Sequence, residues 1–241
     1  MLLHGGAGSW SHWVRNIDAL AAAHALWIPD LPGMGESAMP PEPRDHTAIA
    51  AVLAQDMDEL LPGEERIDLV GFSFGAIVAA WLAGLRHARI RRLVIVGAGG
   101  LGLRPKGERL LHAWKHLKDP AAVAAAHRHN LGALMLSRPE RIDDALLALY
   151  AADVLRARVN SARSSRTAAL KEKLATLGLP LHGIWGRLDV TAHARFDDIR
   201  DMLRAAHPQA RLHVIEDAGH WVQFEQANAF NAALLGLLDN A

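Results

Sequence analysis

The chain has 241 residues, of which 51% are hydrophobic and 22% are charged, so it can bury the core of one large α/β domain. Lysine plus arginine equals aspartate plus glutamate at 26 each, so no net charge attracts nucleic acid or an anionic membrane. Cysteine is absent, which excludes disulfides, thiolate metal sites and cysteine nucleophiles. No apolar run is long enough to cross a bilayer.

The first part of the chain begins with apolar residues and enters a glycine-rich loop at His4. It lacks the basic region and long apolar core of a signal peptide, so we expect a cytoplasmic protein. This start has the character of the last residues of a buried strand whose upstream part is missing. The elements expected next are a helix over 10–23, a short strand over 25–28, a turn-rich loop over 29–37 and a helix over 46–61.

The remaining chain alternates short apolar strands with helices. The expected elements are a strand over 67–70, a helix over 76–82, strands over 90–96 and 181–185, a helix over 195–206, a strand over 212–215 and a helix over 224–238. Such alternation predicts an α/β fold with a mainly parallel, doubly wound sheet of about six strands, covered on both faces.

Residues 101–177 interrupt this alternation. They are rich in alanine, leucine, arginine and histidine, and they show helical spacing over 121–136 and 142–155. The segment follows the carboxyl end of a strand, which is the side where open α/β sheets bind ligands. We therefore predict a core domain of residues 1–100 and 178–241, with residues 101–177 inserted as a helical cap.

The strongest motif is Gly-x-Ser-x-Gly at 71–75, between an apolar strand and a helix-forming run. That context is what a nucleophile elbow requires, because a serine on a sharp strand-to-helix turn holds its hydroxyl clear of the backbone. Glycines at 71 and 75 let the strand and the helix approach without Cβ clashes. Ser73 is therefore the candidate nucleophile.

A serine hydroxyl needs a base to take its proton and an acid to orient that base. His220 follows the strand over 212–215, and Asp189 follows the strand over 181–185, so both lie just past a strand's carboxyl end, as Ser73 does. The chain order Ser, Asp, His is the order of the triad in this kind of fold. Asp217 is the rival acid, and we favour Asp189 because an acid from a neighbouring strand end can reach the far side of the imidazole.

Together these segments resemble the α/β-hydrolase-fold serine hydrolases, over nearly the whole chain. The matching motifs are His4-Gly5-Gly6, Asp-Leu-Pro-Gly-Met-Gly-Glu-Ser at 30–37, Gly-Phe-Ser-Phe-Gly at 71–75, Trp-Gly-Arg-Leu-Asp at 185–189 and Ala-Gly-His-Trp at 218–221. The resemblance implies that Ser73 is the nucleophile, His220 the base and Asp189 the acid. It also implies an oxyanion hole formed by the backbone N–H groups of Gly6 and Phe74.

The chain departs from the family at its start, because two strands that usually precede the one ending at His4 are absent. Either the start was assigned too late, or a partner such as a second copy in a homodimer covers the sheet edge. The missing strands lie far from the predicted catalytic residues, so this departure bears on stability and oligomeric state more than on chemistry.

Aromatic and sulfur-containing side chains near these motifs are candidates for lining a substrate pocket, although core packing explains them equally well. The candidates are Trp10, Phe74, Met135 and Trp221. We expect His4 to hold the oxyanion loop, and His12, His112, His127 and His129 to lie on the surface or in the lid by default. No histidine pair has a metal-site context such as His-Glu-x-x-His, so we expect neither a metal nor another cofactor.

The leading functional hypothesis is hydrolysis of a small carboxylic ester through an acyl-enzyme. The alternative is carbon–carbon bond hydrolysis of a ketone substrate, because the stretch from Arg211 to Glu225 resembles the meta-cleavage-product hydrolases. The elbow departs from that family in having Phe72 before the serine and Ala76 after the second glycine. A non-catalytic receptor for a small ligand is the third hypothesis. For a substrate carboxylate, the candidate ligands are the lid arginines Arg128, Arg156, Arg158, Arg163 and Arg166.

Overall fold

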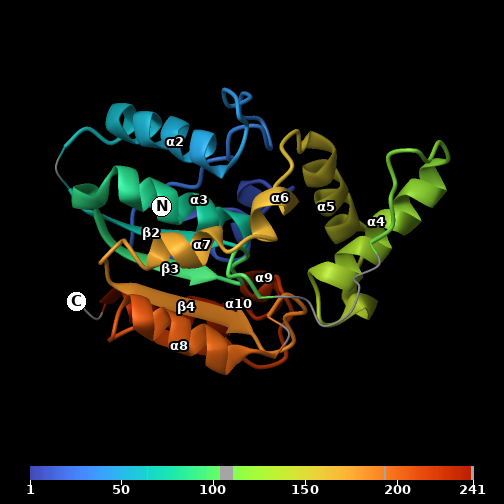
Figure 1. The fold of residues 1–241 in the computed structure, drawn as a ribbon. Helices are drawn as coiled ribbons and strands as arrows, with labels where there is room; N and C mark the ends of the chain where they lie inside the picture. The colour runs from blue at the N-terminus through green and yellow to red at the C-terminus, as the bar shows by residue number, and fades with distance from the viewer. Residues whose placement is uncertain (64, 104–110, 193, 240–241) are drawn as a thin grey trace.

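A parallel five-stranded sheet forms the centre of the computed structural model, which describes residues 1–63, 65–103, 111–192 and 194–239 (Figure 1). The strands lie in the order β1 (Leu2–Leu3), β2 (Ile67–Phe72), β3 (Ile90–Val96), β4 (Leu181–Gly186) and β5 (Arg211–Ile215). Each neighbouring pair is parallel, so the predicted doubly wound α/β fold is confirmed. The carboxyl ends of all strands therefore meet at one edge of the sheet.

The predicted strand over 25–28 is not part of the sheet, so the expectation of about six strands is corrected to five. The segment keeps one recorded hydrogen bond to the sheet, from the N–H of Leu2 to the carbonyl of Trp27 at 2.8 Å. Its would-be neighbour β1 is only two residues long. Such a short partner offers too few backbone groups to extend a ladder of hydrogen bonds.

Helices and short 3-10 turns surround the sheet. They are η1 (Trp10–Trp13), α1 (Ile17–Ala21), α2 (His46–Leu60), α3 (Phe74–Leu85), η2 (His87–Arg89), α4 (Pro120–Leu134), η3 (Pro139–Arg141), α5 (Asp144–Arg156), α6 (Ala162–Ser165), α7 (Ala169–Leu174), α8 (Phe196–Ala206), α9 (Val222–Glu225) and α10 (Ala227–Asp239). None of the helices described is both long and apolar enough to span a membrane.

Two predicted helices are divided in the structure. The helix expected over 10–23 is η1 followed by α1, and the helix expected over 224–238 is α9 followed by α10. At the first break the side chain of Asn16 donates to the carbonyl of Gln223 and to Asn231. This polar tertiary contact joins the two interrupted regions and competes with a continuous helix in either.

Alternate residues of the strands enter two hydrophobic clusters, one on each face of the sheet. Leu93 and Ile95 of β3 pack with α2, α3, α7 and α8, whereas Val94 and Val96 pack with α1, α9 and α10. Successive side chains of a strand point to opposite faces, so a strand that is covered on both sides must be apolar throughout. This arrangement explains the continuous apolar runs in the sequence.

The segment between β3 and β4 contains helices α4 to α7 in its described residues. In Figure 1 the strand arrows point toward α4, α5 and α6, and α4 packs beside α5 away from the sheet. In contrast, Leu170 and Leu174 of α7 belong to the same core cluster as α3. Residues 104–110 of the predicted cap lie outside the described residues, and the domain boundaries stay a prediction.

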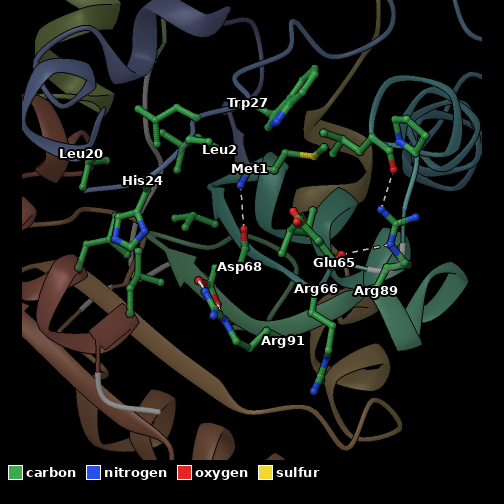
Figure 2. Close-up of a pocket in the computed structure, with 18 residues that line it drawn as sticks. Met1, Leu2, Leu20, His24, Trp27, Glu65, Arg66, Asp68, Arg89 and Arg91 are labelled. Carbon is green, nitrogen blue, oxygen red and sulfur yellow. Dashed lines mark hydrogen bonds and ion pairs between the residues drawn. The ribbon is translucent and has the colours of Figure 1, made fainter. Parts of the chain in front are cut away.

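The opposite edge of the sheet, where the strands begin, holds a cavity of about 270 Å³ (Figure 2). Apolar residues such as Leu20 and Trp27 line it together with charged residues such as Asp68. The N-terminal ammonium of Met1 donates to the carbonyl of Asp68 at 2.7 Å. Because Asp68 lies near the start of β2 and Ser73 follows its end, this cavity is remote from the serine motif.

We expect Leu170→Ala to lower the free energy of unfolding by about 2–5 kcal/mol, since Leu170 is fully buried in the core cluster shared with α3. The matched control is Leu155→Ala on α5, whose side chain is 61% exposed, with an expected change within about 0.5 kcal/mol. Urea unfolding of both variants measures the difference. Equal effects would show that α7 does not share the main core.

Candidate active site

Ser73 occupies the turn between β2 and α3 with φ 52° and ψ −114°. A non-glycine residue with positive φ is uncommon, and its strain persists only where the surroundings impose it. Here the surroundings are backbone atoms. A Cβ on Gly75 would lie 2.3 Å from the carbonyl oxygen of His4, and a Cβ on Gly71 would lie 2.5 Å from that of Gly75. The two glycines of the motif are therefore required by the close approach of α3 to β1 and β2.

The structure brings together the three residues predicted for catalysis. His220 Nε2 lies 3.0 Å from Ser73 Oγ, and His220 Nδ1 lies 3.0 Å from Asp189 Oδ2. Asp189 and His220 are buried, whereas Ser73 is partly exposed. With its Nδ1–H donated to the carboxylate, the neutral imidazole presents Nε2 as the acceptor for the serine hydroxyl proton.

The environment of Asp189 keeps its side chain ionised. Burial opposes the charged form, but the facing His220 and hydrogen bonds from His220 and Thr191 outweigh it and lower the pKa of Asp189 below 3.8. The N–H of Thr191 donates to Asp189 Oδ1 at 2.7 Å. The rival acid Asp217 is exposed and lies 3.5 Å from Arg138, and among the described residues the carboxylate recorded at His220 is that of Asp189.

The loop after β1 carries Gly6, whose N–H is one of the two predicted oxyanion donors. His4 Nε2 accepts from the N–H of Leu31 at 2.8 Å, and His4 Nδ1 then donates to the carbonyl of Gly5. The N–H of Gly5 donates to His12 Nδ1 at 3.1 Å. Both backbone groups of Gly5 are therefore occupied. Within the described residues, the next N–H, that of Gly6, has no recorded partner, nor has the N–H of Phe74.

His12 is buried in η1, which corrects the expectation that it lies on the surface or in the lid by default, whereas His127 lies on α4, inside the predicted cap. The indole N–H of Trp221 donates to the carbonyl of His12 at 2.9 Å. Burial, with His4 and His220 nearby, lowers the pKa of His12 well below 6.5. Burial also lowers the pKa of His4 to about 4. The neutral imidazoles of His4 and His12 can thus hold the loop after β1 as specific hydrogen-bond donors and acceptors near neutral pH.

The four pocket candidates occupy different environments. Met135, Phe74 and Trp221 are buried within the hydrophobic clusters, and Trp10 is 48% exposed. The backbone N–H of Trp221 donates to the carbonyl of Met135 at 2.7 Å. This bond ties the loop that carries His220, called the histidine loop below, to the end of α4. Core packing accounts for the contacts of Met135 and Trp221, and their role in substrate binding stays a prediction.

Sequence reasoning missed a glutamate that supports the histidine loop. Glu225 accepts from the N–H of Gly219 at 2.6 Å and from the N–H of Ser137 at 2.9 Å. It thereby joins the residue before His220 to the connection between α4 and η3. Glu225 ends the stretch that resembles the meta-cleavage-product hydrolases, but that resemblance gave its side chain no role, so only the fold reveals this contact.

Several predicted lid arginines already have protein partners. Arg128 lies 3.1 Å from Asp144, Arg156 lies 3.4 Å from Glu36, and Arg158 donates to the carbonyl of Ser37. Two others, Arg163 and Arg166, are exposed and have no recorded partner in the part of the chain that is described. Across the same residues, no group of three or more histidine, aspartate or glutamate side chains could hold a metal ion.

Comparison with known proteins assigns the chain to a family. Residues 1–233 match the alpha/beta hydrolase family. The chain belongs to this family. It is 31% identical over 257 aligned positions to the dihydrolipoyllysine-residue acetyltransferase component of the acetoin cleaving system of Pseudomonas putida, covering 99% of this chain and 62% of the relative. It is also 29% identical to the 2-hydroxy-6-oxo-6-phenylhexa-2,4-dienoate hydrolase of Burkholderia cepacia, covering 100% of this chain and 87% of that protein.

Solved structures show the same fold. A meta-cleavage product hydrolase from Pseudomonas fluorescens IP01 superposes with a TM-score of 0.77 at 24% identity, covering 99% of this chain and 89% of that one. A thermophilic esterase from Thermogutta terrifontis gives a TM-score of 0.71 at 23% identity, covering 98% and 88% of the two chains. At these identities the likeness extends to the fold and not to the substrate.

We expect Gly75→Ala to destabilise this member of the family by about 1–3 kcal/mol and to lower activity, because its Cβ would meet backbone oxygens that cannot move aside. The control is Gly236→Ala on α10, where an added Cβ meets no atom within 4 Å. Thermal unfolding and turnover of both variants test this. Unchanged stability in Gly75→Ala would contradict the close approach of α3 to β1.

Stability should fall as the pH drops from about 6.5 to 4, because unfolded His4 binds a proton in this range while folded His4, with a pKa of about 4, does not. Between pH 7 and pH 4.5, protonation of His4 in the unfolded chain should lower the free energy of unfolding by about 2–3 kcal/mol. Urea unfolding at both pH values should show a smaller loss in His4→Asn than in the wild type. Exposed His116→Asn is the control, and an unchanged loss in His4→Asn would contradict the assignment.

Proposed function

We propose that the protein is a serine hydrolase that cleaves a small carboxylic ester through an acyl-enzyme. One observation carries the proposal. His220 lies 3.0 Å both from the hydroxyl of Ser73 and from the buried carboxylate of Asp189. A serine within hydrogen-bond reach of a base, with that base oriented by a buried acid, is the arrangement that activates a hydroxyl for attack.

In the first half of the reaction, Ser73 Oγ attacks the ester carbonyl carbon while its proton passes to His220 Nε2. The tetrahedral intermediate collapses when the carbon–oxygen bond to the alcohol breaks, and His220 returns the proton to the leaving alkoxide. A water then attacks the acyl-enzyme, with His220 again taking and returning one proton. The carboxylic acid leaves and Ser73 is restored, so atoms and protons balance without any cofactor.

Two features of the site support the charged states of this path. Asp189 stays ionised and stabilises the imidazolium that forms on His220. The N–H groups of Gly6 and Phe74, which lack recorded partners among the described residues, are suited to donate to the oxyanion. One such donor is worth about 10²- to 10³-fold in kcat.

Hydrolysis of a carbon–carbon bond is the second candidate. The observation that favours it is the 29% identity, over the whole chain, to a protein named as a 2-hydroxy-6-oxo-6-phenylhexa-2,4-dienoate hydrolase. Such a substrate carries a carboxylate, for which Arg163 and Arg166 are the lid arginines without recorded partners in the described chain. In either reaction, we assign α4 and α5 to the cap that shapes the substrate pocket.

The first experiment compares turnover of p-nitrophenyl esters of increasing acyl length with turnover of a 2-hydroxy-6-oxo-hexa-2,4-dienoate. We expect fast ester turnover that Ser73→Ala abolishes and that Asp189→Asn lowers by about 10⁴-fold in kcat. The matched control Asp217→Asn should stay within about threefold of the wild type, because the carboxylate recorded at His220 among the described residues is that of Asp189.

Each outcome decides between the candidates. Ester turnover that disappears in Ser73→Ala, with the dienoate untouched, supports the esterase. Faster dienoate cleavage replaces it with carbon–carbon hydrolysis and directs attention to the two lid arginines. Turnover of neither substrate above the Ser73→Ala background would favour a receptor that keeps the pocket without catalysis.

A further inference from the structure

Ser161, immediately before α6, lies against Gly6, one of the two residues proposed as oxyanion donors, and Gly6 in turn lies near the other, Phe74. A Cβ on Gly6 would be 2.0 Å from Ser161 Oγ and 3.6 Å from Phe74 Cβ. The end of the same helix lies beside the nucleophile, because a Cβ on Gly99 would be 3.0 Å from Ser165 Cβ and the N–H of Gly99 points to the carbonyl of Ser73 at 3.5 Å. The Ser161 hydroxyl is therefore close to the reacting centre.

The ordinary structural role of such a serine is missing here. A serine in the residue before a helix usually accepts a hydrogen bond from the first turn, but Ser161 makes no side-chain cap bond. Its backbone is occupied, since its N–H donates to the carbonyl of Val159 and its own carbonyl accepts from Ser165 Oγ. Within the described residues the half-buried hydroxyl has no recorded partner, so its donor is available to a ligand.

Hydrogen bonds to the core hold the segment that carries Ser161 both before and after this residue. Before it, the N–H of Arg158 donates to the carbonyl of Gly33 at 2.9 Å. After it, Ser164 Oγ lies 2.9 Å from His46 Nδ1, and the carbonyl of Ser165 accepts from the N–H of Gly100 at 2.9 Å. A donor held by such contacts keeps its place during a reaction, which is the condition for stabilising a transition state.

We propose that the Ser161 hydroxyl donates a third hydrogen bond to the substrate oxygen that becomes the oxyanion, beside the N–H groups of Gly6 and Phe74. This inference rests on the proposed function. Ser161 keeps its proton and forms no covalent bond. It adds a donor from the segment between α5 and β4 to one donor from the loop after β1 and one from the start of α3. Since every ester presents the same carbonyl, the contribution of Ser161 is independent of acyl length.

The kinetic test compares Ser161→Ala with Ser161→Thr, which retains a hydroxyl. We expect Ser161→Ala to lower kcat by about 10- to 100-fold with little change in KM, by the same factor for p-nitrophenyl acetate and butyrate. Ser161→Thr should recover most of the loss. A loss that grows with acyl length, or a change in KM alone, would assign Ser161 to pocket shape and overturn the proposal.

A steric test checks the placement itself. Gly6→Ala should lose activity because its Cβ would collide with Ser161 Oγ at 2.0 Å. Combining it with Ser161→Gly removes the collision, so the double variant should be more active than Gly6→Ala alone. A double variant that is no better than Gly6→Ala would contradict the contact. Melting temperatures of all variants identify any that simply fail to fold.

A third measurement separates this inference from the proposed function. A trifluoromethyl ketone that forms a hemiketal with Ser73 places an oxyanion in the site without turnover. If no ester is hydrolysed but Ser161→Ala still weakens this adduct by about 10-fold or more, the esterase proposal fails and the role of Ser161 stands. If esters are hydrolysed and the adduct is unchanged in Ser161→Ala, the role of Ser161 is wrong. Absence of the adduct in the wild type would overturn both.

Discussion

The close approach of α3 to β1 is the constraint on which the site depends. Only a hydrogen atom fits at Gly75 between the helix and the carbonyl of His4, and Gly71 is equally confined against α3. The chain must therefore turn sharply at Ser73, which accepts a positive φ of 52°. This single turn holds Ser73 Oγ 3.0 Å from His220 Nε2. It also places the N–H of Phe74 at the start of α3, beside the loop that carries Gly6.

Hydrogen bonds that involve no substrate then define the rest of the site. His4 bonds the carbonyl of Gly5 and His12 accepts from its N–H, so the next N–H in the loop, that of Gly6, is the one left to bind a ligand. Both imidazoles perform this role while neutral, and their burial keeps them neutral. Glu225 likewise holds the histidine loop, by accepting a hydrogen bond from the backbone N–H of Gly219. Preorganisation of this kind lets donors meet a developing charge without reorganising at the moment of reaction.

The helices between β3 and β4 contribute to the site in two ways. The end of α4 is bonded to the histidine loop through Met135 and Ser137, so the helices above the site are linked directly to the proposed base. The segment that leads into the short helix α6 instead approaches the loop after β1 and brings Ser161 against Gly6. The segments proposed for the cap therefore also hold the loops that carry the proposed catalytic groups.

The sequence by itself determined the elements whose signals are local: apolar runs for β2 to β5, helical spacing for α4 and α5, and the glycines that make the turn at Ser73 possible. The order of Ser73, Asp189 and His220 after three strand ends also predicted which side chains meet, because parallel strands end at one edge. The tertiary structure alone decided that residues 25–28 leave the sheet, that His12 is buried, and that Glu225 and Ser161 reach the site. These outcomes depend on contacts between segments distant in the sequence, which no local pattern encodes.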